Sequence, residues 1–430
     1  MARSSTGSGG VNQEHKNSGS GLSGFDIVCI GCVEWLVIHS VAEYTMLGFA
    51  QSNRVLFVEP FGSWITLART ARWQRRSRAN RPRLEQVGEN LWVYRPPPVG
   101  FPGVSRWRWP AVLNGLILAV LLRRVTRRLG FQQPLLWTYL YNTAALLRSF
   151  PARLRIYECG DHDEAFARDE RQRRLVRQHE AKVCRAADLV FAVTEELAAP
   201  RRAYNRNTYA VNCAAALDFF GRALNPQTSV PEDIDALPRP VLGYLGGVDP
   251  WKIDVELLLY IARRHPDWSV ALVGYVWFGF DPQQLAVCPN IHVLGPKNYD
   301  DFPRYLKGMD VCIMPFPLND ITRNGDALKL YEYLAGGRPV VSTSVPAARR
   351  LASVVRIADT PEAFVAAIEA ALADPPEATA RRLEAVRPHS WEARNREKAE
   401  LIQRRLADLS QASSGRNSFR LRSKASDARS

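Results

Sequence analysis

The sequence lacks any run of 18 or more apolar residues, so we expect no helix that spans a membrane. Residues 1–24 are rich in Ser and Gly and lack the apolar core of a secretory signal, so we expect no export leader. The longest apolar stretch is Ala111–Leu122, with Trp and Arg residues before it and arginines after it. This pattern predicts either a buried core helix or a segment in a membrane interface.

Cysteine is also scarce, and its pattern excludes a disulfide framework. The seven cysteines are an odd number scattered through apparent strands and helices, which fits a reducing cytoplasm. Cys29 and Cys32 have the spacing of a metal or redox pair, but no second CxxC accompanies them. We therefore interpret them as core or loop thiols, and we predict no metal site and no cofactor.

Positive charge is abundant and local. The net charge is +14, and seven of the fifteen residues from 69 to 83 are Arg, with none acidic. Further arginines stand at positions 106, 108, 123, 124, 127 and 128. Such clusters favour nucleic acid, an anionic membrane surface or a phosphorylated substrate, and the alternative is an ordinary solvated surface. No nucleic-acid motif accompanies them, so we do not expect nucleic acid as a partner.

The ordered chain reads as two successive α/β series, each of which predicts a parallel sheet. In the first series, apolar and β-branched runs predict strands at 25–31, 54–60, 91–94, 135–139, 154–158 and 189–194. After a Pro-rich break, the second series predicts strands at 241–247, 269–274, 291–294, 311–315, 340–343 and 354–357. Helices near 38–51, 164–186, 254–264, 300–308, 327–336 and 361–373 alternate with them.

Two α/β halves of similar size imply a cleft between two domains. We place the first domain at 25–225 and the second at 238–388, followed by a helix at 389–408 that crosses back to the first. Residues 1–24 and 409–430 are rich in Ser, Arg, Gly and Asn, and we expect both to be disordered tails.

A short predicted helix after residue 326 carries the most informative side chains. Asp326 has the residue type of an N-cap, Lys329 adds a positive charge to the helix start, and Glu332 lies one turn or two deeper. A glycine pair and Pro339 follow, and then a β-branched strand. A diphosphate fits such a helix start, and the carboxylate can accept hydrogen bonds from both hydroxyls of a ribose. The alternative is an ordinary helix with a surface Glu and Lys.

Residues 328–341 resemble the nucleotide-sugar segment of GT-B glycosyltransferases of the family-4 type. They most resemble the subgroup linked to teichuronic acid and other bacterial envelope polysaccharides. Further stretches match in order, at 240–247, 290–295, 310–316 and 390–392. The resemblance covers about residues 25–400, and it implies the GT-B fold of two Rossmann-like domains whose parallel sheets face an interdomain cleft.

The resemblance implies roles for particular residues on the donor side. Glu332 would bind the donor ribose, and the turn at Gly246 and Gly247 would approach the diphosphate or the sugar. Arg323 and Lys329 would neutralise the leaving diphosphate, because enzymes of this type generally use no bound metal. Leu294 and Gly295 would border the base, and Asp326 belongs to the same predicted site.

On the acceptor side, three residues are candidates. Gly31 lies in the turn after the first strand, and His39 follows it at the start of a helix, where an ordinary helix histidine is the alternative. Asp161 follows a predicted strand at its carboxyl end, with Asp163 nearby, and would bind the acceptor hydroxyl. We count Asp161, Arg323 and Lys329 as the catalytic candidates.

Three positions depart from the family pattern. Asn324 stands where the commoner form has a first Glu, Asp326 stands where the subgroup often has Asn, and Ala215 replaces a turn glycine. We therefore keep two functional hypotheses besides a transferase. One is a binding protein of this fold with weakened catalysis, and the other is a nucleotide-sugar 2-epimerase.

The favoured hypothesis is a retaining glycosyltransferase in envelope or exopolysaccharide biosynthesis. It would move a sugar from a nucleotide-diphosphate donor to a lipid-linked or polysaccharide acceptor. The expected location is the cytoplasm, as a peripheral protein at the inner face of the plasma membrane, where the arginine clusters would meet anionic lipid.

Overall fold

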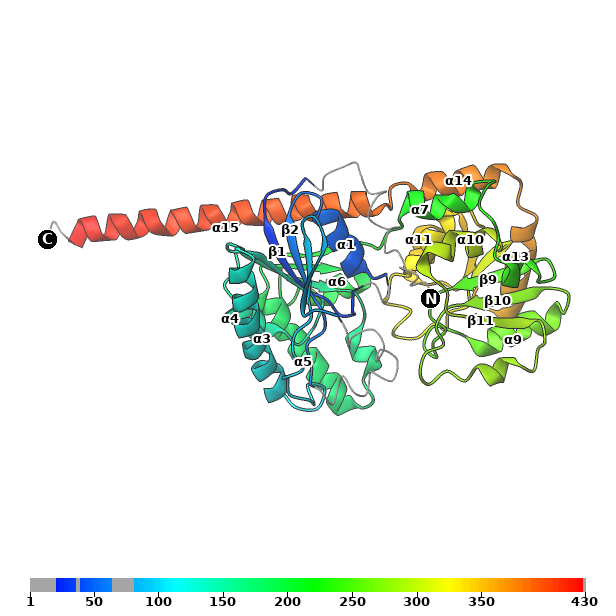
Figure 1. Cartoon of the computed structure of the whole chain (residues 1–430), viewed down its shortest axis with the longest axis horizontal. Coiled ribbons are helices and arrows are strands. Elements are labelled where there is room, and N and C mark those ends of the chain that lie inside the picture. The colour runs from blue at the N-terminus through cyan, green and yellow to red at the C-terminus, as the bar shows by residue number, and fades with distance from the viewer. Residues whose placement is uncertain (1–20, 36–38, 64–80, 428–430) are drawn as a thin grey trace, which may run out of the picture.

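Two parallel sheets, one in each half of the chain, organise the structure (Figure 1). It is a computed structural model, and it describes residues 21–35, 39–63 and 81–427. The sheets stand side by side, and a long C-terminal helix runs along the first half and projects beyond it. Most of the predicted arginine run at 69–83 and of the predicted N-terminal tail lies outside the described residues.

The first half contains an eight-stranded sheet in the order β3-β4-β2-β1-β5-β6-β7-β8, in which β3 alone is antiparallel to its neighbour. Its elements are β1 Asp26–Ile30, α1 Val41–Phe49, β2 Arg54–Val58, β3 Leu84–Gly88, β4 Leu91–Tyr94, α3 Trp109–Arg128, β5 Leu135–Thr138, α4 Ala144–Ser149, β6 Leu154–Cys159, α5 Glu170–Ala186, β7 Leu189–Ala192, α6 Glu195–Arg201 and β8 Thr208–Ala210.

The second half contains a six-stranded, all-parallel sheet in the order β11-β10-β9-β12-β13-β14. Its elements are α7 Leu217–Gly221, α8 Glu232–Asp235, β9 Val241–Leu245, α9 Val255–Arg264, β10 Ser269–Val273, β11 Ile291–Gly295, α10 Phe302–Lys307, β12 Val311–Met314, α11 Leu328–Ala335, β13 Val340–Ser342, α12 Pro346–Arg350, β14 Val355–Ile357, α13 Pro361–Leu372 and α14 Glu377–Val386. The last helix is α15, Trp391–Asp427.

Strand β1 shows how the first sheet is covered on both faces. Successive side chains of a strand point to opposite faces. Val28 and Ile30 join a core that includes residues of α3, α4 and α5. Ile27 and Cys29 join a second core that includes residues of α1 and α15. Burial on both faces explains why these strands read as continuous apolar runs.

The predicted parallel sheets and nearly all predicted strands are confirmed, with ends that differ by a few residues. Two strands that the sequence did not predict, β3 and β8, lie at the edges of the first sheet. β3 reads Leu-Glu-Gln-Val-Gly and is half-exposed, so it lacks the apolar run that marks the central strands.

The chain passes between the halves at two places. The first passage follows β8, and α7 then packs on α10 and α11 of the second half. The second passage leads into α15, which contacts α1 of the first half, as predicted. The two passages lie side by side, because the Ala215 N–H donates to the His389 carbonyl at 3.0 Å.

Two expectations about the tails need correction. Leu22, inside the predicted N-terminal tail, is fully buried against the second core, so order begins before residue 25. The predicted C-terminal tail is helical from residue 409 as far as Asp427. The segment contains no proline, so its backbone can continue the hydrogen-bonded pattern of α15.

The expectation that no helix could span a membrane also needs correction. α3 runs for 20 residues, and by length and composition it is able to cross a membrane, although 44% of its apolar part is buried inside the protein. The apolar stretch in the sequence ends at Leu122, because two arginines follow it. The helix continues through them, since arginine is a good helix former.

Candidate functional site

The carboxyl ends of the two sheets face each other where the halves meet. The Thr194 hydroxyl, after β7, donates to the Asn324 carbonyl at 2.6 Å. The ring of Phe166, after β6, lies edge-on to Trp251, after β9, with centroids 5.7 Å apart. Parallel α/β sheets bind their ligands at this edge, so the candidate site lies between the halves.

A glycine turn after β9 brings backbone close to a lysine. Gly246 has φ +136°, a conformation that favours glycine, and a Cβ there would lie 3.0 Å from the Lys329 ammonium. Gly274, after the neighbouring β10, also has positive φ, and its Cβ would lie 1.9 Å from the Gly246 carbonyl oxygen. A Cβ on Gly247 would meet the Trp277 ring nitrogen at 2.4 Å. Close packing against protein atoms therefore requires glycine in this turn, and its approach to a diphosphate or sugar stays a prediction.

Lys329 is held by aromatic groups instead of by an acid. Its ammonium donates to the Tyr244 hydroxyl and lies 3.9 Å from the centroid of the Tyr244 ring. It also lies 5.2 Å from the centroid of the Phe316 ring, so both rings provide cation–π contacts. Burial lowers the pKa of Lys329 to about 7, with Lys252 adding to the effect. An anion beside it would restore the full positive charge.

Glu332 lies one turn further along α11 and is 7% exposed. Its carboxylate has no hydrogen-bond or ion-pair partner among the described residues. Burial raises the pKa of Glu332 to about 7, and the nearby charge of Lys329 opposes that shift. A buried carboxylate without donors is costly, so this side chain is suited to accept hydrogen bonds from a ligand.

Asp326 does not cap α11, which corrects the prediction for this residue. The N-cap residue is Ala327, which has no side chain able to accept a hydrogen bond. The Asp326 carboxylate instead accepts the Cys213 N–H at 2.6 Å and the Arg350 guanidinium at 3.0 Å. It therefore ties the first passage between the halves to α12. No side chain among the described residues caps the first turn of α11, so the N–H groups of Leu328 and Lys329 are available to an anion.

The other predicted donor-side residues lie at the same edge but engage differently. Arg323 is exposed, and its Nε donates to the Leu318 carbonyl at 3.0 Å. Leu294 and Gly295 end β11, and Gly295 has φ +72°. The Gly295 carbonyl accepts the Gly274 N–H at 3.0 Å, which joins the ends of β11 and β10.

Asp161 faces the second half from the end of β6. Its side chain is accessible to solvent, yet the crowding of surrounding protein raises its pKa, while Lys252 lowers it and Asp249 raises it. Both of those neighbours belong to the loop after β9. The predicted acceptor-side carboxylate is thus within electrostatic range of the loop that follows the glycine turn.

Lys252 is a site residue that the sequence argument missed. Its charge acts on both Asp161 and Lys329, so it is within electrostatic range of an acceptor-side and a donor-side candidate. The Asp249 carboxylate fixes its backbone by accepting the Lys252 N–H at 2.8 Å. Its place in the sequence could have identified it, because Lys252 follows the glycine turn within six residues and so lies at the same edge of the sheet.

His39 and Gly31 have structural roles at this edge. The His39 ring stacks on Tyr299 with centroids 3.6 Å apart, so it joins the two halves, and burial lowers its pKa to about 4. A Cβ on Gly31 would lie 2.3 Å from the Phe57 ring, so close packing requires glycine there. Whether either residue contacts an acceptor stays a prediction.

The positions that depart from the family pattern lie where the halves join. The Asn324 side-chain amide donates to the Asp320 carbonyl at 2.7 Å and lies 3.4 Å from the His162 ring. Ala215 pairs with the second passage through its backbone N–H. Asn324 thus lies against the first half, and Ala215 joins the two passages.

Cys29 is buried and Cys32 is exposed, and both are free, in agreement with the prediction of separate thiols. No group of three or more potential metal ligands occurs within residues 21–35, 39–63 and 81–427.

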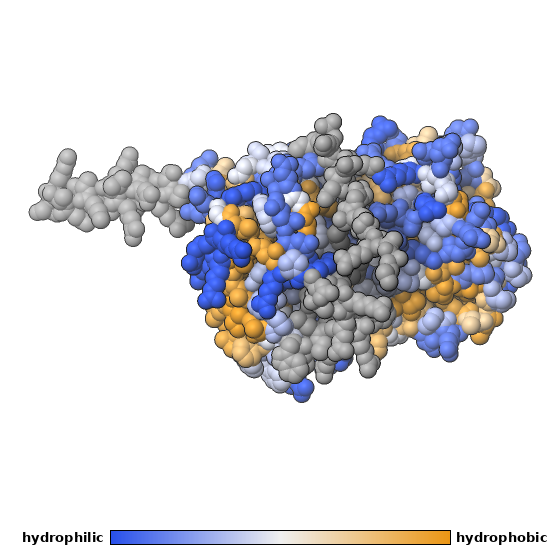
Figure 2. Space-filling model, in the orientation of Figure 1, coloured by the Kyte–Doolittle hydropathy of each residue, from blue (hydrophilic) through white to orange (hydrophobic). Residues whose placement is uncertain are grey.

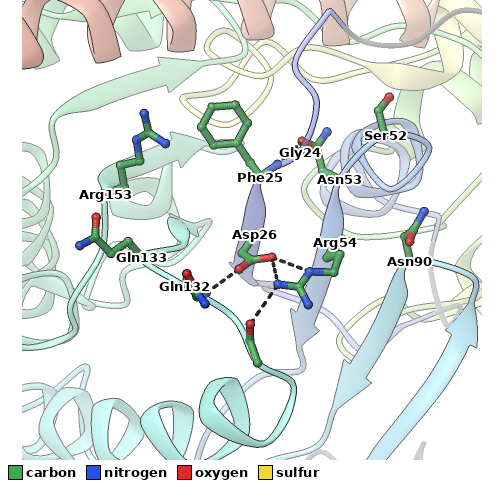
Figure 3. Close-up of a pocket in the computed structure, with 11 residues that line it drawn as sticks. Gly24, Phe25, Asp26, Ser52, Asn53, Arg54, Asn90, Gln132, Gln133 and Arg153 are labelled. Atoms are coloured by element: carbon green, nitrogen blue, oxygen red, sulfur yellow. Dashed lines mark hydrogen bonds and ion pairs between the residues drawn. The ribbon is translucent and has the colours of Figure 1, made fainter.

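A separate pocket of about 630 Å³ lies at the amino ends of β1 and β2, on the edge opposite the candidate site (Figure 3). There the Asp26 carboxylate accepts hydrogen bonds from the Arg54 guanidinium and from the Gln132 N–H. Asp26 and Arg54 are thus paired with each other, and the Arg153 guanidinium lies over the Phe25 ring, 5.1 Å from its centroid. We assign this pocket no role in the chemistry.

Comparison with known proteins identifies the kind of domain that the second half resembles. Residues 239–374 match the family described as "Glycosyl transferases group 1". The chain is 26% identical over 238 residues to a protein of Bacillus subtilis named as a teichuronic acid biosynthesis glycosyltransferase, TuaH. That match covers 50% of this chain and spans 58% of the length of the relative.

Solved structures show the same architecture. A sucrose-phosphate synthase from Thermosynechococcus elongatus superposes with a TM-score of 0.65 at 17% identity, covering 89% of this chain and 100% of that chain. A trehalose-6-phosphate synthase from Burkholderia multivorans superposes with a TM-score of 0.62 at 13% identity, covering 91% of this chain and 100% of that chain. The fold is therefore GT-B, with two Rossmann-like domains, as predicted.

Proposed function

We propose that the protein transfers a sugar from a nucleotide-diphosphate donor to a lipid-linked or polysaccharide acceptor, because residues 239–374 match the group 1 glycosyltransferase family. The observation that carries the proposal is the buried Glu332 carboxylate. It has no protein partner among the described residues, and it lies one turn from Lys329 at the carboxyl edge of the second sheet. The two hydroxyls of a ribose would supply the hydrogen bonds that this carboxylate lacks.

The leaving diphosphate would sit at the start of α11. Negative charge develops on it as the bond to the sugar breaks, so groups that stabilise that charge accelerate transfer. Lys329 and the uncapped N–H groups of the first turn of α11 are in place for this task. Lys252 adds a second cation nearby, and Arg323, exposed at the same edge, would act from the rim.

The acceptor would approach from the first half. Asp161 would orient its hydroxyl, while the leaving phosphate takes its proton, so no protein nucleophile is required. Such a reaction retains the configuration of the sugar. The similarity to a protein named for teichuronic acid biosynthesis supports an envelope or exopolysaccharide as the product. We place the reaction in the cytoplasm, at the inner face of the plasma membrane.

The decisive experiment compares the wild-type protein with Glu332→Ala in calorimetry with UDP- and GDP-sugars and in transfer to a membrane extract. We expect at least about a tenfold loss of donor affinity, because a hydrogen bond to a charged group contributes about 1.5–3 kcal/mol. Glu377→Ala, which removes an exposed carboxylate from α14, is the matched control and should behave as the wild type.

Three outcomes separate this proposal from its alternatives. Unchanged donor binding in Glu332→Ala would reject the site. Tight binding without turnover on any extract would favour a binding protein of weakened catalysis. Product formed from the donor alone, with no acceptor, would indicate a 2-epimerase.

A further inference from the structure

Helix α3 carries an exposed apolar stripe that neither the sheet nor another helix covers. The stripe consists of Trp109, Val112, Leu113, Leu116 and Val120, which are between 38% and 50% exposed. Their spacing of three and four residues places them on one side of the helix. The opposite side, with Leu118, Ala119 and Leu122, packs in the core of the first half. Figure 2 shows apolar surface on the side of the first half that α3 and α4 cover.

The stripe is part of a rigid surface. A Cβ on Gly115 would lie 2.8 Å from the Leu146 nitrogen, so α3 packs closely on α4 along its inner side. The Asn114 side chain accepts the Phe101 N–H at 2.6 Å and donates to the Phe101 carbonyl at 2.9 Å. These two hydrogen bonds fix the preceding loop to the helix. The loop adds three exposed apolar residues: Val99, Phe101 and Trp107.

The chain segment that contains the stripe carries charge of one sign. Residues 90–157 contain ten arginines and no lysine, aspartate or glutamate. Arginines flank the stripe at both ends, at positions 106 and 108 and again at 123, 124, 127 and 128. Arg95 and Arg155 pair with acids outside this segment, so the arginines that flank the stripe are the ones able to attract an anionic surface.

At the carboxyl end of α3, arginines converge on a pocket. The pocket holds about 430 Å³ and is lined by Arg83, Arg124, Arg128, Tyr94 and two apolar side chains. The charges of Arg83 and Arg124 act on the Tyr94 hydroxyl. Among the described residues, none of the three arginines has an acidic partner. The pocket is therefore suited to a phosphate group.

We propose that α3 and the loop at 99–107 dock the protein on an anionic lipid bilayer. The apolar stripe enters the interfacial layer, and the arginine pocket binds a lipid headgroup phosphate. This inference deepens the proposed function, because it names the surface through which an enzyme acting on a lipid-linked acceptor would reach its substrate.

The packing favours docking over spanning. A helix that crosses a bilayer exposes apolar side chains all round, whereas the inner side of α3 is committed to α4 and the first sheet. Trp and Arg at the ends of an apolar stripe suit a helix that lies in the plane of the interface. α3 also belongs to the half that carries Asp161, so docking would bring the acceptor-side half to the membrane.

The test is co-sedimentation of the full chain with vesicles of phosphatidylcholine alone or mixed with phosphatidylglycerol. We expect binding to the mixed vesicles that weakens as salt rises. Arg124→Ala/Arg128→Ala should lower the partition coefficient about 25-fold, since each arginine near an anionic surface contributes about fivefold. Leu116→Glu/Val120→Glu should lower it at least about tenfold.

Matched controls remove similar groups elsewhere. Arg171→Ala/Arg206→Ala makes the same change in charge on the exposed surface of the first half. Val287→Glu/Leu372→Glu makes the same kind of change at exposed apolar positions of the second half. Both controls should bind vesicles nearly as the wild type does. Equal losses in a control and its test variant would overturn the proposal, as would equal binding to neutral and mixed vesicles.

A second copy of the chain is the other occupant of the stripe. If the wild type sediments as a dimer without vesicles and Leu116→Glu/Val120→Glu makes it monomeric, the stripe is a dimer interface and the proposal fails. Donor binding without vesicles separates this result from the proposed function. The α3 variants should retain it, whereas Glu332→Ala should lose it and still bind vesicles.

Discussion

Lys398 and Glu158 form an ion pair of 2.7 Å although 240 residues separate them in the sequence, and each side chain is 1% exposed. Lys398 comes from α15, which begins beside the second half, and Glu158 comes from β6 of the first sheet. The same Glu158 carboxylate accepts hydrogen bonds from the Trp137 ring nitrogen and the Tyr139 hydroxyl. The pair therefore fixes the C-terminal helix to the acceptor-side half.

Lys398→Met should destabilise the protein by about 3–5 kcal/mol, because it leaves the Glu158 charge buried without its counter-charge. Urea denaturation followed by tryptophan fluorescence would measure the loss. Arg396→Met, at an exposed position of the same helix, is the control and should change stability by less than about 0.5 kcal/mol. Adding Glu158→Gln to Lys398→Met should recover part of the loss. No recovery would contradict the pairing.

Asp326→Asn should lower the free energy of unfolding by about 2–3 kcal/mol. The substitution removes the negative charge that accepts the Cys213 N–H, and it leaves Arg350 without its counter-charge. Asp301→Asn offers a comparison at the surface, where Asp301 pairs with Arg304 at 2.8 Å. That exposed pair should contribute about 0–1 kcal/mol. Thermal unfolding of both variants would show whether Asp326 is the structural tie described above. Equal small losses would reject that role.

Gly274→Ala should impair folding and donor binding together. The new Cβ would lie 1.9 Å from the Gly246 carbonyl oxygen, and φ of +153° is itself unfavourable for alanine. We expect a loss of about 2–4 kcal/mol, measurable by chemical denaturation. Gly221→Ala is the control, since nothing lies within 4 Å of its Cβ position. A stable Gly274→Ala protein with normal donor affinity would show that the turn can move aside.

The free energy of unfolding should depend on pH because of Glu332. Its folded-state pKa is raised from the ordinary value of 4.5 to about 7, chiefly by burial. Between these values the folded state binds more protons than the unfolded state, so the contribution of Glu332 to stability is greatest below pH 4.5 and is lost as the pH rises to about 7.

The measurement is the unfolding free energy of the wild type minus that of Glu332→Gln at each pH, because other groups largely cancel in the difference. We expect this difference to fall between about pH 4.5 and pH 7. A saturating nucleotide diphosphate should flatten the curve, since a bound ribose would stabilise the charged carboxylate. A flat curve without ligand would show that Glu332 is not buried as described.

The sequence predicted the features that depend on local pattern. Apolar runs such as Val241–Leu245 identified the central strands, because strands buried on both faces need apolar side chains at every position. The half-exposed β3 has no such run and was missed. Glu332 was identified by the resemblance of its segment, and the structure adds the burial that gives its carboxylate an unusual pKa.

The sequence could not predict the contacts between distant segments. Asp326 looked like a helix cap because aspartate is common there, but its partners Cys213 and Arg350 lie 113 and 24 residues away. Lys252 shows the same limit. Its electrostatic effect on both Asp161 and Lys329 depends on how the two halves meet, which no local pattern specifies.

The paired passages between the halves have a mechanical consequence. Because the segments at Ala215 and His389 are joined by a backbone hydrogen bond, the two connections act as one narrow strap instead of two separate tethers. We expect this join to act as a hinge, because its two segments cannot move independently. Contacts far from it, such as that between Phe166 and Trp251, are the ones that a rotation of the halves about the hinge would open.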